Sequence, residues 1–105
     1  MFNHVAHLTL LPDASHEQFE AIAEGLLALP PLIDGLVSAE VVRDAGLVAG
    51  NASLRFHLRF ADRASWEGYK SHPAHVAVIT ERIAPVLADK VFVQYEDDAV
   101  RSFGP

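Results

Sequence analysis

The sequence predicts an α+β domain of the ferredoxin-like type, βαββαβ, with a four-stranded antiparallel sheet and its helices on one face. Two observations carry this prediction. One is a strictly alternating segment, "SLRFHLRF", and the other is an apolar helical stripe that follows a capping motif. Two strand–helix–strand halves follow each other along the chain, the second with its helix broken in two. We therefore expect one domain over residues 1–97 and a short tail without pattern over 98–105.

The first half begins with "HVAHLTLL", a short run rich in β-formers that ends at the turn residues 12–13. Ser15 and Gln18 then have the spacing of a capping box, in which each side chain satisfies a backbone N–H at the start of a helix. The apolar residues after them share one helical face: Phe19, Ile22, Ala23, Leu26 and Leu27. The prolines at 30–31 should end this helix.

Two strands then follow in succession: "LVSAEVV" at 36–42 closes the first half, and "SLRFHLRF" at 53–60 opens the second. The alternation in the latter places Leu54, Phe56, Leu58 and Phe60 on one face and Arg55, His57 and Arg59 on the other. By the same parity, His4, Ala6 and Leu8 share one face of the first strand, and Val5, His7, Thr9 and Leu11 share the other.

A broken helix precedes the last strand. "DRASWEGYKS" predicts a short helix with Asp62 as N-cap, and Pro73 suits the first turn of the next one. Pro85 should kink or end that second helix. Its expected inner face consists of Val76, Ile79, Ile83 and Leu87. "KVFVQYE" reads as the closing strand.

Composition excludes several classes of function. The net charge is −6 and the basic residues are scattered, which argues against nucleic acid as a partner. The absence of cysteine excludes disulfides and thiolate metal sites. We find no signal peptide and no membrane-spanning segment, so the expected location is the cytoplasm.

The sheet face away from the helices mixes apolar side chains with charges of both signs, including Glu40 and Val42. Two interpretations remain open. The face is either a solvated surface or a self-complementary interface between two copies, and Glu40 could pair with Arg55 or Arg59 within or across subunits. The apolar content favours a homodimer.

The segment "YKSHPAHVAV" at 69–78 contains the side chains best suited to chemistry. Histidine exchanges protons near neutral pH, and tyrosine more often donates a hydrogen bond or stabilises an oxyanion. His75 falls at the edge of the predicted buried face, where it can line a cavity between helix and sheet that His4 also approaches. The alternative is structural, with His72 as a helix cap and His75 as a half-buried side chain. We expect no metal, because Pro73 disturbs the geometry of the His72–His75 pair and no carboxylate adjoins it.

Four segments are distinctive: "HVAHLTLLPDAS", "SAEVVRD", "LRFADRASWEGYKSHPAHVAV" and "VFVQYE", and the most distinctive motif among them is "Y-x-x-H-P-x-H". In these segments the sequence resembles the stress-responsive A/B barrel (Dabb) domain family, which includes olivetolic acid cyclase, a cofactor-free polyketide cyclase. The resemblance implies a ferredoxin-like subunit that dimerises into an α/β barrel, with no cofactor.

The resemblance also implies a site. His75 would be the general base and Tyr69 would orient the substrate and stabilise enolate charge. The residues implied to line the same pocket are His4, Ala6, Leu8, Ile22, Leu26, Phe56, Leu58, His72 and Val76. Two features depart from the cyclase, which has aromatic residues where this chain has Ile22 and Leu26, and an acidic residue where it has Gln94.

Three functions follow as hypotheses. The first is a cofactor-independent cyclase, lyase or isomerase acting on a β-keto or phenolic compound. The second is a stress-related protein that binds an apolar or aromatic small molecule without turnover. The third is a cofactor-free monooxygenase, which rests on analogy of fold alone.

Overall fold

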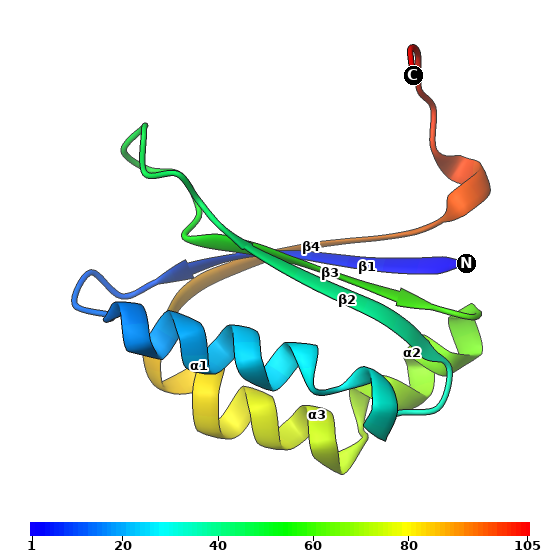
Figure 1. The fold of residues 1–105 in the computed structure, drawn as a ribbon, viewed down its shortest axis with the longest axis horizontal. Helices are drawn as coiled ribbons and strands as arrows, with labels where there is room; N and C mark the ends of the chain where they lie inside the picture. Colours follow the sequence, from blue (N-terminus) through cyan, green and yellow to red (C-terminus); the bar gives the residue numbers. More distant parts are fainter.

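A computed structural model describes all residues, 1–105. It contains a four-stranded antiparallel sheet in the order β2-β3-β1-β4. The strands are β1 (Phe2–Leu10), β2 (Leu36–Arg43), β3 (Leu54–Phe60) and β4 (Leu87–Glu96). The helices α1 (His16–Leu27), α2 (Arg63–Lys70) and α3 (Pro73–Val78) all lie on one face of the sheet (Figure 1). The predicted ferredoxin-like fold is confirmed.

Helix α1 begins with the predicted capping box. Ser15 Oγ accepts from the backbone N–H of Gln18 at 3.1 Å, and the Gln18 side chain accepts from the backbone N–H of Ser15 at 2.8 Å. The helix ends at Leu27, ahead of the prolines, which form the 3-10 turn η1 (Pro30–Leu32). Leu27 was expected on the inner face, but it is 51% exposed. It lies at the edge of the apolar stripe, and Phe19, Ile22, Ala23 and Leu26 fill the core instead.

The third helix differs most from prediction. It continues past Val78 as a π-helical turn, η2 (Ile79–Ile83), and a 3-10 turn, η3 (Ala84–Val86), which contains Pro85. Val76 and Ile79 were expected inside but are 45% and 37% exposed. The buried residues of the segment are Val78, Ile83 and Val86, whereas Leu87 already belongs to β4.

Close packing between α1 and the segment 73–86 explains why the buried face of this segment differs from the predicted one. A Cβ on Gly25 would lie 2.8 Å from Cδ of Arg82, so a larger residue here would force the Arg82 side chain to move. The Arg82 guanidinium donates to the Ala21 carbonyl at 2.7 Å. These contacts turn Val78 toward α1 and Val76 toward solvent.

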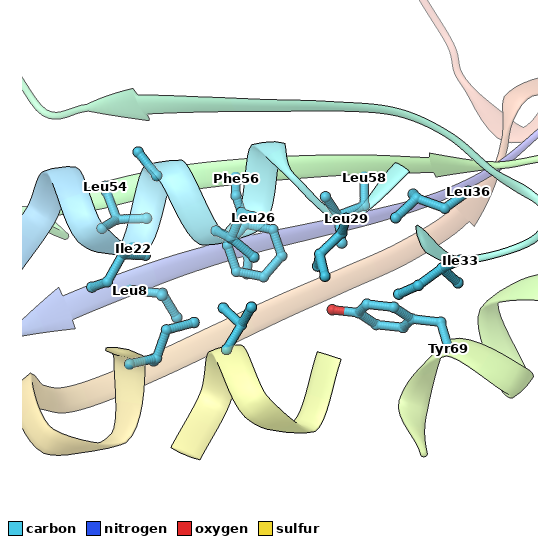
Figure 2. Close-up of a cluster of buried hydrophobic side chains, with 14 of the residues drawn as sticks. Leu8, Ile22, Leu26, Leu29, Ile33, Leu36, Leu54, Phe56, Leu58 and Tyr69 are labelled. Atoms are coloured by element: carbon cyan, nitrogen blue, oxygen red, sulfur yellow. The ribbon is translucent and has the colours of Figure 1, made fainter. Parts of the chain in front are cut away.

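The expected parity of the sheet is confirmed in β1 and β3. Leu54, Phe56, Leu58 and Phe60 are buried beneath the helices, and the residues between them are only half-buried. The core lies between this face and the helices, as Figure 2 shows for ten labelled side chains. No helix is long and apolar enough to cross a membrane.

Candidate functional site

A cavity of about 460 Å³ lies between the helices and the β1–β4 side of the sheet. The sheet contributes His4, Leu8, Phe56, Lys90, Phe92 and Gln94 to its wall. Helix α2 and the segment after it contribute Trp66, Tyr69, Lys70, His75, Ile79 and Ile83. Most of the wall is apolar or aromatic and a few polar groups converge on it, which is typical of small-molecule sites.

Tyr69 and His75 are held together at this cavity by the helix junction. Their rings stack with centroids 3.9 Å apart, since Tyr69 lies in the last turn of α2 and His75 lies in the first turns of α3. Tyr69 is 2% exposed, and its hydroxyl points into the interior (Figure 2). Burial raises the pKa of Tyr69 well above its ordinary value, so the phenol stays protonated and acts as a hydrogen-bond donor.

The backbone fixes the tautomer of His75. Its Nδ1 lies 3.2 Å from the carbonyl oxygen of Lys70, which can only accept, so Nδ1 carries the proton and Nε2 keeps a free lone pair. Burial lowers the pKa of His75, opposed by its bonds to the backbone of Lys70 and Tyr69 and assisted by the charge of His72. His75 is therefore neutral at pH 7 and available as a base.

His4 is the second buried imidazole. The amide nitrogen of Gln94 lies 3.0 Å from its Nδ1, so Nδ1 accepts and Nε2 carries the proton. Its ring stacks on Phe92 with centroids 5.4 Å apart and lies 5.8 Å from the Tyr69 ring. Burial, and then the charges of His75 and His57, lower the pKa of His4 to about 4, which makes it a neutral donor at pH 7.

The structure separates the residues predicted to line one pocket. His4, Leu8, Phe56, Tyr69 and His75 border the cavity. Ala6, Ile22, Leu26 and Leu58 do not border it, because they are fully enclosed in the core between α1 and the sheet. Val76 points outward with α3 turned toward α1, as described above.

His72 is a helix cap. Its Nδ1 accepts from the backbone N–H of Ala74 at 3.1 Å, and this leaves the ring outside the cavity wall. Gln94 borders the cavity but contacts His4, so the group that orients His75 is a backbone carbonyl. No group of three or more His, Cys, Asp or Glu residues is placed to hold a metal ion.

Sequence reasoning missed Trp66, Lys70, Lys90 and Phe92 as wall residues. Two signals could have found them. Trp66 precedes Tyr69 and Lys70 by three and four residues, which places all three on one side of α2. Lys90 and Phe92 share the parity of Gln94, and antiparallel pairing sets Phe92 opposite Ala6 and Gln94 opposite His4.

A second depression, of about 490 Å³, lies on the opposite face of the sheet. Its wall is mainly polar and its groups bond to one another. Asn3 is 1% exposed and donates to Asp97 at 2.7 Å, and His57 Nε2 lies 2.8 Å from the Asn3 side-chain oxygen. Arg59 donates to Asp97 at 3.0 Å. Since these groups satisfy each other, the helix-side cavity is the better candidate for a functional site.

The fold and the helix-side cavity define a ferredoxin-like α+β domain with a candidate site between helices and sheet. The chain belongs to the stress responsive A/B barrel domain family, whose model matches residues 2–97. None of the curated proteins compared with the chain matches it.

Solved structures agree in fold. A dimeric ferredoxin-like protein of unknown function from Thermobifida fusca is 31% identical, with a TM-score of 0.78 over 90% of this chain and 88% of its own. The protein At3g17210 from Arabidopsis thaliana is 23% identical, with a TM-score of 0.82 over 97% of this chain and all of its own. A hydroxynitrile lyase from Passiflora edulis is 15% identical, with a TM-score of 0.79 over 99% of this chain and 96% of its own.

Proposed function

We propose that the protein is a small enzyme that moves a proton on a β-keto or phenolic compound, as a cyclase, lyase or isomerase does, with no cofactor in the step. The observation that carries the proposal is the stacked Tyr69–His75 pair at the wall of an apolar cavity, with the His75 tautomer set by a carbonyl. The hydroxynitrile lyase of similar fold supports the view that this fold accommodates lyase chemistry.

In the proposed step, Nε2 of His75 removes a proton from a carbon next to a carbonyl group. The electron pair of the C–H bond forms the enolate, and the carbonyl oxygen gains the negative charge. The Tyr69 hydroxyl donates a hydrogen bond to that oxygen, a contact that strengthens as charge develops. The imidazolium then returns the proton to carbon or to a leaving group, so the enzyme ends unchanged.

Hydrogen–deuterium exchange tests this step without knowledge of the natural substrate. Aryl ketones and β-keto esters would be incubated with the protein in D₂O, and loss of the α-proton followed by NMR. His75→Gln should slow exchange by roughly 10²–10⁴-fold, the usual contribution of a positioned base. Tyr69→Phe should slow it by roughly 10²-fold. His16→Gln is the matched control, because His16 is exposed and does not border the cavity. Exchange at the wild-type rate in His75→Gln would rule out the role of His75.

A second candidate function uses the same cavity without turnover. The predominantly apolar wall is the observation that favours it, since such a wall is sufficient to bind an apolar or aromatic small molecule. This function predicts that a ligand raises the melting temperature and that His75→Gln retains the effect. A broad panel of aromatic and polyketide compounds that never shifts the melting temperature would count against it.

We further propose that two copies pair through the open face of the sheet to form the dimeric barrel. Val42, Val91 and Val93 project there and are 49%, 58% and 50% exposed. The relative from Thermobifida fusca is described as dimeric, which supports the proposal. Val91→Lys should give a monomer in sedimentation experiments, whereas Val48→Lys, in a loop, should not. A monomeric wild-type protein at micromolar concentration would contradict the interface.

A further inference from the structure

The chain has only two lysines, Lys70 and Lys90, and both border the helix-side cavity. No aspartate or glutamate borders it, although the protein has 14 acidic residues against 8 lysines and arginines. The cavity is thus a locally cationic site in an acidic protein. The positive charge at the cavity bears on the choice of ligand, because the electric field in a partly enclosed site of low dielectric favours ligands of the opposite charge.

The two lysines differ in how far their charges are already neutralised. Lys70 Nζ lies 3.0 Å from a carboxylate oxygen of Glu67 and 4.6 Å from the centre of the Trp66 ring. Lys90 Nζ forms no ion pair with any carboxylate, and its nearest aromatic contact is the Phe92 ring at 5.8 Å. Lys90 is therefore the cation that is free to meet a ligand.

The neutral polar groups of the wall also favour a ligand that accepts hydrogen bonds. The Tyr69 hydroxyl is protonated and can donate, and the buried Trp66 Nε1–H has no hydrogen-bond partner within the protein. His4 carries its proton on Nε2, because Nδ1 accepts from Gln94. His75 Nε2 is the acceptor that the proton-transfer step uses. Donors otherwise predominate, and a carboxylate, which only accepts, complements them.

We propose that the ligand of this cavity is a carboxylic acid with an apolar or aromatic body, whose carboxylate pairs with Lys90. The inference rests on the proposed function only in that the cavity binds a small molecule, and it holds for an enzyme or a binding protein alike. The apolar body would pack against Trp66, Phe56 and Phe92. The carboxylate would remain near the rim, where the lysine side chain reaches solvent.

A matched pair of probes tests the proposal: 4-phenylbutanoate and its uncharged amide, 4-phenylbutanamide. Trp66 is the chain's single tryptophan and borders the cavity, so its fluorescence reports occupancy, and calorimetry gives the affinity independently. The acid should bind about tenfold more tightly than the amide, as one charge-assisted contact gives. Added salt should weaken the binding of the acid and leave the binding of the amide unchanged.

Variants then locate the charge. Lys90→Gln should abolish the preference for the acid, and Lys90→Arg should keep most of it. Arg63→Gln is the matched control, because Arg63 is an exposed cation on α2 that does not border the cavity. His75→Gln should still bind the acid, which separates anion recognition from proton transfer.

Two outcomes would overturn the inference. If the amide binds as tightly as the acid, or if Lys90→Gln retains the preference, the cavity binds small molecules without selecting anions, and the proposed function survives. If neither probe changes the fluorescence nor releases heat, both the anion preference and the cavity binding beneath it fail.

Discussion

The buried His4 imidazole makes the stability of this protein depend on pH in a calculable way. Its pKa falls from 6.5 to about 4 on folding, mainly because burial disfavours the charged ring. The unfolded chain therefore binds the proton first as the pH decreases. The stabilising contribution of neutral His4 is complete above pH 6.5 and is lost progressively between pH 6.5 and 4.

The size of this effect on the free energy of unfolding follows from the difference between the two pKa values of His4. It corresponds to about 3 kcal/mol in total, at about 1.4 kcal/mol for each tenfold change in proton affinity. Between about pH 7.5 and about pH 5, the wild-type protein should lose about 2 kcal/mol of unfolding free energy through this group. That is a large share of the stability of a small domain.

His4→Phe removes the titrating group and keeps an aromatic ring against Phe92 and Trp66. Urea denaturation at a series of pH values would give the free energy of unfolding of both proteins. The wild-type curve should fall about 2 kcal/mol further than the variant over that interval. His75 titrates in both proteins, so the comparison isolates His4.

His16→Gln is the matched control, since the His16 side chain is 61% exposed at the start of α1, away from both the cavity and the open face of the sheet. It should retain the wild-type dependence on pH. Equal slopes for the wild type and His4→Phe would refute the reasoning, because a buried neutral imidazole cannot be removed without removing its proton linkage.

Three further predictions concern the fold. Gly35 has φ +82°, and an added Cβ there would overlap the Ser65 hydroxyl, whereas Gly50 has φ +89° and lies in open space. Gly50→Ala should therefore cost about 1 kcal/mol of unfolding free energy, and Gly35→Ala clearly more, as measured by thermal unfolding. Equal losses would exclude the contact with Ser65. Ser15→Ala should cost about 1 kcal/mol, because it breaks the capping box, and an unchanged midpoint in urea would contradict this. The Asn3 amide and then the terminal ammonium lower the Asp97 pKa to about 2 from 3.8, so its contribution is present above pH 3.8 and lost toward pH 2; Asp97→Asn should flatten that part of the acid titration.

Local rules were sufficient where neighbours in the chain decide the structure. The capping box at Ser15, the N-cap at Asp62 and the alternation of β3 each depend on residues close in sequence, and each was predictable. The helix-side location of His4 and His75 followed from strand parity and helical period in the same way, whereas that of Tyr69 came from the family resemblance.

Prediction failed where distant elements pack. The 3.6 period placed Val76 inside, but the approach of Arg82 to α1 across Gly25 turned the helix, and of the predicted pair only Ile79 borders the cavity. The cavity wall on β4 was missed for a related reason. Lys90 and Phe92 reach it only through the pairing of β4 with β1, a contact that spans most of the chain.

The π-helical turn at 79–83 gives the cavity an unusual dependence on backbone register. A π turn holds one residue more than the α-helical path it replaces, and deleting that residue would rotate everything between it and β4 by about 100°. Ile83 and Ala84, which now form part of the wall, would face elsewhere. Relatives with the same side chains but one residue fewer in this turn would then enclose a differently shaped space. A one-residue insertion or deletion in this turn would therefore reshape the cavity without the substitution of any wall residue.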